Sequence, residues 1–368
     1  VDDDGTEATD TDDATVDFTN VAPAIEVTKT ADPTSVPETG GSVTFTFTVK
    51  NTSTEEPVTI TALTDSVYGT LDGDADCKVG TVLAAGASCE FSFTKWVEGD
   101  FSGDDHFNEF TAVAEDNDGT DASDTDDATV DFTDVAPTIL VEKTPSVNSV
   151  PETGGDVTFT FKVTNTSSEE SVTILSLVDD VYGTLVGQVG VCEVGTVLAA
   201  GASCEFSITR EVEGNYSGPD HVNVFTAVAE DNDGTDATDN DDATVDFTDV
   251  APTIDVTKTA NPTAVLETGG DVLFTFTVTN TSSEEPVTIL SLEDSVYGTL
   301  AGDDDCKVGT TLLAGGVCTF TLTQWVEGDY SGPDHVNAFT AKAVDDDGTE
   351  ATDTDDATVD FTNVAPAI

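Results

Sequence analysis

Hydrophobic and polar residues alternate strictly along many short segments of this chain. From Val43 to Val49 every odd position is Val or Phe and every even position is Thr. A period of two, built from β-branched and aromatic residues, is typical of a β-strand with one buried and one solvent-exposed face. Similar runs predict further strands at Ile25 to Thr30, Val58 to Leu63, Cys89 to Val97, Phe107 to Ala114 and Ala128 to Thr133.

Turn-forming residues separate the predicted strands, for example in Pro37 to Gly41 (PETGG) and at Asn51 to Ser53. No segment shows the 3.6-residue period of an amphipathic helix. Roughly seven strands in about 115 residues, joined by turns rich in Gly and Pro, are typical of a sandwich. We therefore predict an all-β fold, an antiparallel Ig-like β-sandwich.

This pattern recurs along the chain. An Ala-Pro pair begins at Ala22, Ala136, Ala251 and Ala365, in steps of 114, 115 and 114 residues. The period is the size of a whole domain, so we expect tandem domains in a linear array. The additional residue of the middle repeat, between Leu185 and Cys192, predicts a surface loop. The expected boundaries are the last hairpin of a preceding repeat at 1–21, Ig-like repeats at 22–135, 136–250 and 251–364, and the start of a further repeat at 365–368.

The first 25 residues, Val1 to Ile25, are identical to the last 25, Val344 to Ile368. We expect the sequence to be a window from a longer, nearly uniform array. Its partner would then be itself, by continuation of the chain or by donation of a strand from one subunit to the next, with lateral bundling as a further possibility.

Four sequence elements together resemble a known kind of repeat. They are KTADP from Lys29, FTVKNT from Phe47, LAAGASCEF from Leu83 and DDATV from Asp126. Repeat by repeat, the whole chain is similar to the Ig-like repeats strung in tandem in bacterial and archaeal cell-surface proteins. The resemblance implies an extracellular or cell-surface location. It does not name a ligand, because such repeats serve as stalks, adhesin arms and matrix fibres.

The charge balance narrows the possible partners. The chain has 10 Lys and Arg against 74 Asp and Glu, a formal net charge of −64. Binding to nucleic acid needs clustered Lys and Arg, so nucleic acid is excluded as a partner. No apolar run approaches the ~20 residues needed to cross a bilayer, and we expect no direct membrane insertion in this segment.

Each repeat contains two cysteines, always twelve positions apart. A metal site would need more Cys or His nearby, so we favour disulfides that pin a loop to the following strand. Disulfides indicate an oxidising, extracytoplasmic environment. The predicted pairs are Cys77–Cys89, Cys192–Cys204 and Cys306–Cys318.

Carboxylates are concentrated near the end of each repeat. Residues 115–131 contain eight carboxylates and no Lys or Arg. The Asp-x-Asp-Gly segment is expected to turn the chain from one strand to the next, and the acids that follow would bring further oxygens back towards it. Crowded carboxylates repel each other unless a cation neutralises them, and hard oxygen ligands suit Ca²⁺. The spacing is not that of an EF-hand.

We therefore predict calcium sites at the repeat junctions, with Glu38 or Asp65 as possible additional ligands from a neighbouring repeat. The alternative is a solvated acidic surface, as in proteins adapted to high salt. The predicted ligands are Asp2, Asp4, Asp10, Asp12 and Asp13; Asp116, Asp118, Asp121, Asp124, Asp126 and Asp127; Asp231, Asp233, Asp236, Asp239, Asp241 and Asp242; and Asp345, Asp347, Glu350, Asp353, Asp355 and Asp356.

Three other sets of residues are candidates for a functional role, and the sequence gives less support for each of them. The histidines (His106, His221 and His335) show no nucleophile beside them and are expected to be structural. Trp96 and Trp325 align with Glu211, so we expect them to be exposed, where they are candidates for lateral contacts. Four asparagines begin glycosylation sequons and are equally typical of turns: Asn51, Asn165, Asn215 and Asn280.

The sequence shows no catalytic set, and we do not expect an enzyme. The preferred interpretation is an extracellular structural protein, a calcium-stabilised rod or filament in a cell-surface fibre, stalk or biofilm matrix. The alternatives are an adhesin arm whose binding domain lies elsewhere, and a surface-layer-type protein adapted to high salt without specific calcium sites.

Overall fold

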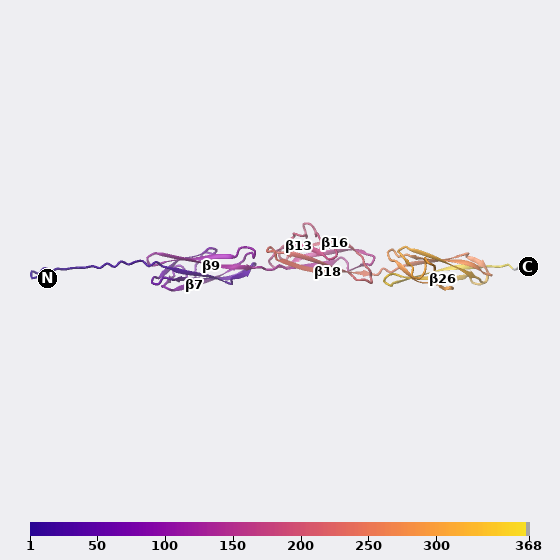
Figure 1. Cartoon of the computed structure of the whole chain (residues 1–368), viewed down its shortest axis with the longest axis horizontal. Coiled ribbons are helices and arrows are strands. Elements are labelled where there is room, and N and C mark those ends of the chain that lie inside the picture. Colours follow the sequence, from indigo (N-terminus) through magenta and orange to yellow (C-terminus); the bar gives the residue numbers. More distant parts are fainter. Residues whose placement is uncertain (366–368) are drawn as a thin grey trace. The chain divides into compact units, whose positions relative to one another are not determined.

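The computed structural model describes residues 1–365, and every regular element in them is a β-strand (Figure 1). The described residues contain no helix of the length and hydrophobicity needed to cross a membrane. Strands of the first repeat are β1 (Ile25–Asp32), β2 (Ser35–Pro37), β3 (Gly41–Asn51), β4 (Val58–Asp65), β5 (Gly69–Thr70), β6 (Val82–Leu83), β7 (Ser88–Val97), β8 (His106–Glu115) and β9 (Asp121–Thr133).

The second and third repeats contain the same nine strands in the same order. Those of the second are β10 (Ile139–Pro145), β11 (Ser149–Pro151), β12 (Gly155–Asn165), β13 (Val172–Asp179), β14 (Gly183–Thr184), β15 (Val197–Leu198), β16 (Ser203–Val212), β17 (His221–Glu230) and β18 (Asp236–Thr248). Those of the third are β19 (Ile254–Asn261), β20 (Ala264–Leu266), β21 (Gly270–Asn280), β22 (Val287–Asp294), β23 (Gly298–Thr299), β24 (Thr311–Leu312), β25 (Val317–Val326), β26 (His335–Val344) and β27 (Glu350–Thr362).

Each repeat is a β-sandwich of two sheets. In the first repeat, the smaller sheet has the antiparallel order β1-β3-β7, and the larger has the order β2-β9-β8-β4-β5 with β6 paired to β4. All pairs in the larger sheet are antiparallel except β2 with β9, which run parallel. The other repeats have the same two sheets. The predicted all-β fold of tandem sandwiches is therefore confirmed.

The hydrophobic core lies between the two sheets. The alternation predicted from Val43 to Val49 is confirmed, because the four Val and Phe side chains of this segment are fully buried on β3. Phe47 meets Phe110 of β8 edge to face, with ring centroids 4.9 Å apart. Burying one such side chain contributes about 1.5–3 kcal/mol, and this pairing holds the two sheets together.

The six cysteines form three disulfides at the expected pairs. Cys77 lies in the loop between β5 and β6, and Cys89 lies on β7; their Cα atoms are 5.2 Å apart. The pairs Cys192–Cys204 and Cys306–Cys318 have the same separation. Each disulfide ties a loop to a strand of the smaller sheet.

Both tryptophans are exposed, Trp96 at 62% and Trp325 at 57%. The ring of Trp96 lies directly over Gly40, which adopts a φ of 102°. Three of the four sequon asparagines, Asn51, Asn165 and Asn280, are fully buried. These three are therefore inaccessible to glycosylation in the folded chain.

The chain divides into two compact units. Val1–Pro137, Ser167–Val172 and Glu230–Ala237 form the first, and Thr138–Thr166, Thr173–Ala229 and the residues from Thr238 onward form the second. Two loops of the second sequence repeat thus belong to the first unit. Residues 1–21 form no strand. The boundaries at 22–135, 136–250 and 251–364 stay predictions, and residues 366–368 lie outside the described part.

Candidate metal centres

The acidic turn between the last two long strands is held by one of its own carboxylates. In the second repeat, Asp231 Oδ1 accepts hydrogen bonds from the backbone N–H groups of Asp233 and Thr235, each at 2.9 Å. Gly234 supplies the positive φ of 85° that the turn requires. Asp231 is 94% buried, yet its Oδ2 has no hydrogen-bond partner. The turn therefore presents an unpaired carboxylate oxygen as well as the side chain of Asp233.

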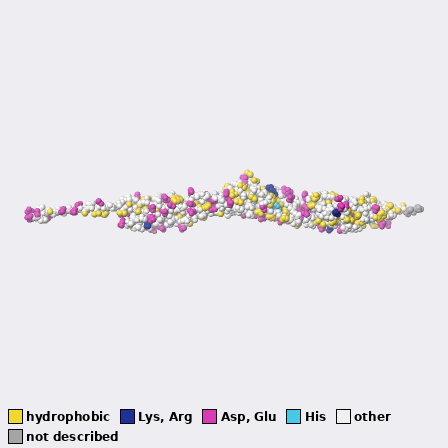
Figure 2. Space-filling view, in the orientation of Figure 1, with side chains coloured by type: hydrophobic (Ala, Val, Ile, Leu, Met, Phe, Trp, Pro, Cys, Tyr) yellow, Lys and Arg dark blue, Asp and Glu magenta, His cyan; other side chains and the backbone are white. Residues whose placement is uncertain are grey.

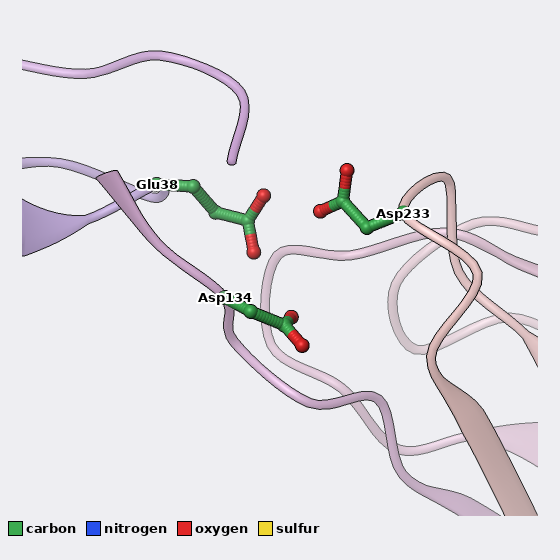
Figure 3. Close-up of side chains that lie close together, drawn as sticks. All are labelled: Glu38, Asp134 and Asp233. Atoms are coloured by element: carbon green, nitrogen blue, oxygen red, sulfur yellow. The ribbon is translucent and has the colours of Figure 1, made fainter. Parts of the chain in front are cut away.

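Three carboxylates converge within the first unit, and we call them the first cluster. Glu38 follows β2, Asp134 follows β9, and Asp233 comes from the acidic turn after β17. One oxygen from each lies within 4.8 Å of the others. Figure 3 shows the three carboxylates facing a common space from three separate chain segments. Residues of two sequence repeats thus form one cluster inside a single compact unit.

Hydrogen bonds fix the cluster but leave oxygens free. Glu38 accepts from the backbone N–H groups of Val135 at 2.7 Å and Phe101 at 3.3 Å. Asp134 Oδ2 accepts from the Thr235 hydroxyl at 2.8 Å. Asp134 Oδ1 and both oxygens of Asp233 are buried without a partner. Buried carboxylate oxygens are nearly always paired, so the unpaired oxygens of this cluster are donors that could hold a metal ion.

The second unit contains an equivalent second cluster, formed by Glu152, Asp249 and Asp347. Its supporting bonds repeat those of the first cluster. Val250 N–H donates to Glu152 at 2.7 Å, and the Thr349 hydroxyl donates to Asp249 at 2.8 Å. Asp249 Oδ1 is again buried without a partner. The recurrence shows that the arrangement is encoded in the repeat.

A partial version occurs at the acidic turn of the first repeat. Here Asn20 takes the place of Asp134, and its Nδ2 donates to the Thr120 hydroxyl at 3.0 Å. Asp118, which corresponds to Asp233, is exposed in this turn. An Asp-to-Asn change keeps an oxygen donor but removes a charge.

Burial and charge act on the glutamates in the clusters and beside them. Burial raises the pKa of Glu38, and neighbouring Asp233 raises it further, although hydrogen bonds from Val135 and Phe101 act in the opposite direction. Burial also raises the pKa of Glu170, with Glu38 contributing next. Glu152 and Glu285 show the same upward pKa shifts, led by burial, in the second unit. A divalent cation would relieve this repulsion.

Most of the sequence-predicted ligands lie outside the clusters. Asp233 and Asp347 belong to them, and the proposed additional ligand Glu38 does as well. Asp65 does not, because it forms an ion pair with Lys29 in the core. Asp116, Asp231 and Asp345 hold the turns with Oδ1 and present an unpaired Oδ2.

Other predicted ligands are used differently. Asp124 and Asp126 lie well inside β9, opposite Ala112 and Phe110, and not back at the start of the turn as expected. They accept hydrogen bonds from the backbone of β1. The pairs Asp239 and Asp241, and Asp353 and Asp355, do the same in their repeats. The remaining ones are exposed: Asp2, Asp4, Asp10, Asp12, Asp13, Asp118, Asp121, Asp127, Asp236, Asp242, Glu350 and Asp356.

Two cluster residues, Asp134 and Asp249, were not predicted as ligands. Each stands directly before a Val-Ala-Pro segment, at the end of a long strand. An acid at that fixed position in two successive repeats was an available signal. It lies 14 residues beyond the Thr that ends the acidic turn of its own repeat, and so outside the dense run of carboxylates.

Comparisons with known proteins find likeness in structure alone. No protein-family model matches the chain, and no curated protein sequence matches it. One similar structure is a tetra-tandem repeat in the extending region of a large adhesion protein, with 20% identity and a TM-score of 0.23 over 92% of this chain and 74% of the other. Another, from work on host cell surface retention of a 1.5-MDa bacterial ice-binding adhesin, has 18% identity and a TM-score of 0.30 over 94% and 100%.

A third similar structure is described as a Ca²⁺-stabilised adhesin that helps an Antarctic bacterium to bind ice. It has 16% identity and a TM-score of 0.28 over 95% of this chain and 76% of the other. TM-scores of this size carry no argument about function, which rests here on the geometry of the clusters.

Proposed function

We propose that this chain is an extension segment of an extracellular adhesin or surface fibre, in which Ca²⁺ links successive repeats. The observation that carries the proposal is the first cluster and its recurrence as the second. Each cluster draws two carboxylates from one sequence repeat and one from the next. A cation bound there would restrict movement between the two repeats.

The donor set favours calcium over other metals. The clusters contain carboxylates and no His or Cys, and such hard oxygen ligands suit Ca²⁺, which accepts six to eight oxygens in flexible geometry. Glu38 and Asp134 are positioned by backbone and hydroxyl donors, which prepares the cluster for an ion. Asp231 Oδ2 offers a further unpaired oxygen in the same turn.

An extracellular setting agrees with this role. The three disulfides need an oxidising compartment to form and persist. Calcium sites of extracellular modules work with dissociation constants of about 10⁻⁴–10⁻³ M. Asp and Glu side chains are also spread over the surface (Figure 2), so nonspecific screening by salt must be separated from binding at the clusters.

Calorimetric titration of the full chain with CaCl₂ at constant ionic strength tests the proposal. We expect saturable binding that MgCl₂ at the same ionic strength does not reproduce. Asp233→Asn should remove the first site and leave the second. Asp236→Asn is the matched control, because Asp236 is an exposed carboxylate three positions further along the chain, at the start of β18.

Removal of calcium should lower the thermal midpoint, because a ligand at 100 times its dissociation constant stabilises the folded state by about 2.7 kcal/mol. If EDTA left the midpoint unchanged at fixed ionic strength, the acidic surface would be an adaptation to salt and the calcium role would be refuted. Equal titrations for Asp233→Asn and Asp236→Asn would refute the assignment of the cluster.

A further inference from the structure

Each repeat buries a lysine beside an aspartate in the middle of its core. In the first repeat, Lys29 of β1 and Asp65 of β4 have fully buried side chains, and Lys29 Nζ lies 2.7 Å from Asp65 Oδ2. Lys143 with Asp179 and Lys258 with Asp294 form the same pair at 2.7 and 2.5 Å. Three of the ten Lys and Arg residues of a very acidic chain are used in this way.

An asparagine completes each group. Asn108 of β8 is fully buried, and its Nδ2 lies 3.2 Å from Asp65 Oδ2 and 3.3 Å from Asp65 Oδ1. Lys29 Nζ also donates to the backbone oxygen of Asn108 at 2.8 Å. The aspartate therefore bridges an amine and a carboxamide that approach each other from opposite sheets. Asn223 and Asn337 occupy the same position in the other repeats.

The surroundings exclude water, and burial acts against the charge on the amine. The rings of Phe45 and Phe47 lie 5.5 Å from Lys29 Nζ, measured to their centroids. Burial lowers the pKa of Lys29, although Asp65 acts in the opposite direction. The Asn108 Oδ1 atom is buried with no hydrogen-bond partner. Within the described residues, no hydrogen bond therefore engages its side-chain carbonyl oxygen.

A simple ion pair does not account for this arrangement. Burying two charges costs about as much free energy as their attraction returns, so such a pair contributes little to stability. Nor does an ion pair require a carboxamide with an unsatisfied oxygen beside it. A nucleophile, an acid–base group and an electrophile in contact are instead what an acyl transfer needs.

We propose that the three groups are self-modifying sites, in which the lysine and asparagine side chains of each repeat condense to an amide. Asp65 accepts a proton from the Lys29 ammonium, and the neutral Nζ attacks Cγ of Asn108. Asp65 then returns the proton to Nδ2 as the Cγ–Nδ2 bond breaks. A Cγ–Nζ amide bond forms, and Nζ gives up its second proton through Asp65 to the departing ammonia, which leaves as ammonium. Asp65 ends as the carboxylate it began as. No oxidant, cofactor or second protein is needed.

The product would tie β1 of the smaller sheet covalently to β8 of the larger one. The same reaction joins Lys143 to Asn223 and Lys258 to Asn337. This proposal is independent of calcium, because the groups lie in the core of each sandwich and not in the acidic clusters.

The intact mass of the purified full chain, measured after reduction and denaturation, tests the proposal directly. We expect a mass lower than the sequence requires by three molecules of ammonia. Proteolysis should yield a branched peptide that joins the Lys29 and Asn108 segments. A mass equal to that of the unmodified sequence would overturn the proposal. Loss of water instead of ammonia would overturn Asn108 as the electrophile.

Asp65→Asn tests the acid–base role. This substitution keeps the volume of the side chain, so the first repeat should lose its amide while the other repeats keep theirs, with two molecules of ammonia missing. Fluorescence of Trp96 in a Trp325→Phe background reports whether the first repeat is still folded. A folded variant that still lacked three molecules of ammonia would overturn the role of Asp65.

Discussion

Asp124 Oδ2 accepts a hydrogen bond of 2.8 Å from the backbone N–H of Val27, which lies 97 residues earlier in the chain. Asp126 makes the same contact with the N–H of Lys29 at 2.7 Å. Val27 and Lys29 belong to β1, the edge strand of the smaller sheet, and the two aspartates belong to β9 of the larger. Carboxylates therefore close the seam between the sheets, where an edge strand would otherwise have unpaired donors.

Removing one of these carboxylates should destabilise the first repeat. Asp124→Ala leaves the buried Val27 N–H without its acceptor, which costs about 1–3 kcal/mol. Urea unfolding followed by Trp96 fluorescence in a Trp325→Phe background measures the change in the first repeat alone. Asp127→Ala is the control, because Asp127 is exposed on the other face of the same strand and should change stability by less than about 0.5 kcal/mol.

Loss of a disulfide should act on one repeat only. Replacing Cys77 and Cys89 by Ala removes a closed loop of 12 residues from the unfolded state, which costs about 3 kcal/mol. Calorimetric melting should show one transition at lower temperature and the others unchanged. A uniform shift of all transitions would contradict the assignment of one disulfide to one repeat.

Calcium affinity should fall as the pH is lowered, and the fall should begin early. Because burial and Asp233 raise the pKa of Glu38, this group binds a proton at a pH where an exposed glutamate, with a pKa of about 4.3, is still ionised. Protons therefore begin to compete with Ca²⁺ at a pH above the pKa of an exposed glutamate, and the competition increases as the pH falls further. Calcium titrations at neutral and mildly acidic pH measure the effect. In Glu38→Gln, whose side chain does not titrate, the pH dependence of the first site should weaken.

Gly40 and Gly154 offer a matched pair of substitutions. Both adopt positive φ, at 102° and 104°, so an alanine costs about 1–2 kcal/mol of backbone strain at either position. At Gly40 the new methyl group would also collide with the Trp96 ring, whereas at Gly154 the nearest atom is 3.5 Å away. We expect Gly40→Ala to destabilise its repeat more and to change Trp96 emission. Equal losses with unchanged emission would show that the ring does not rest on Gly40.

Local patterns predicted the sandwich but only part of the site. The alternation from Val43 to Val49 involves only residues that are adjacent in sequence, so the strand could be predicted from the sequence alone. The first cluster depends on Glu38, Asp134 and Asp233, which separate strands and turns bring together over almost 200 residues. No spacing rule connects positions so far apart.

The sequence contained enough information to predict that Asp124 and Asp126 accept backbone hydrogen bonds inside the sandwich. Both occupy the same face of β9 as the buried Ala128, Val130 and Phe132, because every second residue of a strand points the same way. An aspartate on the inward face needs a buried donor. The alternation of these acids along the strand, and not their density, indicates this role.

The parallel pairing of β2 with β9 has a consequence for tension. These strands lie near the two ends of the first repeat, and Ser35 to Pro37 pair with Asp131 to Thr133 in the same direction. A force that pulls the chain by its ends would slide β2 against β9 along their length, so all hydrogen bonds between them would have to break together. An antiparallel pair pulled from one end opens one bond at a time. This pairing would therefore resist stretching of the first repeat without a bound ion or a covalent cross-link.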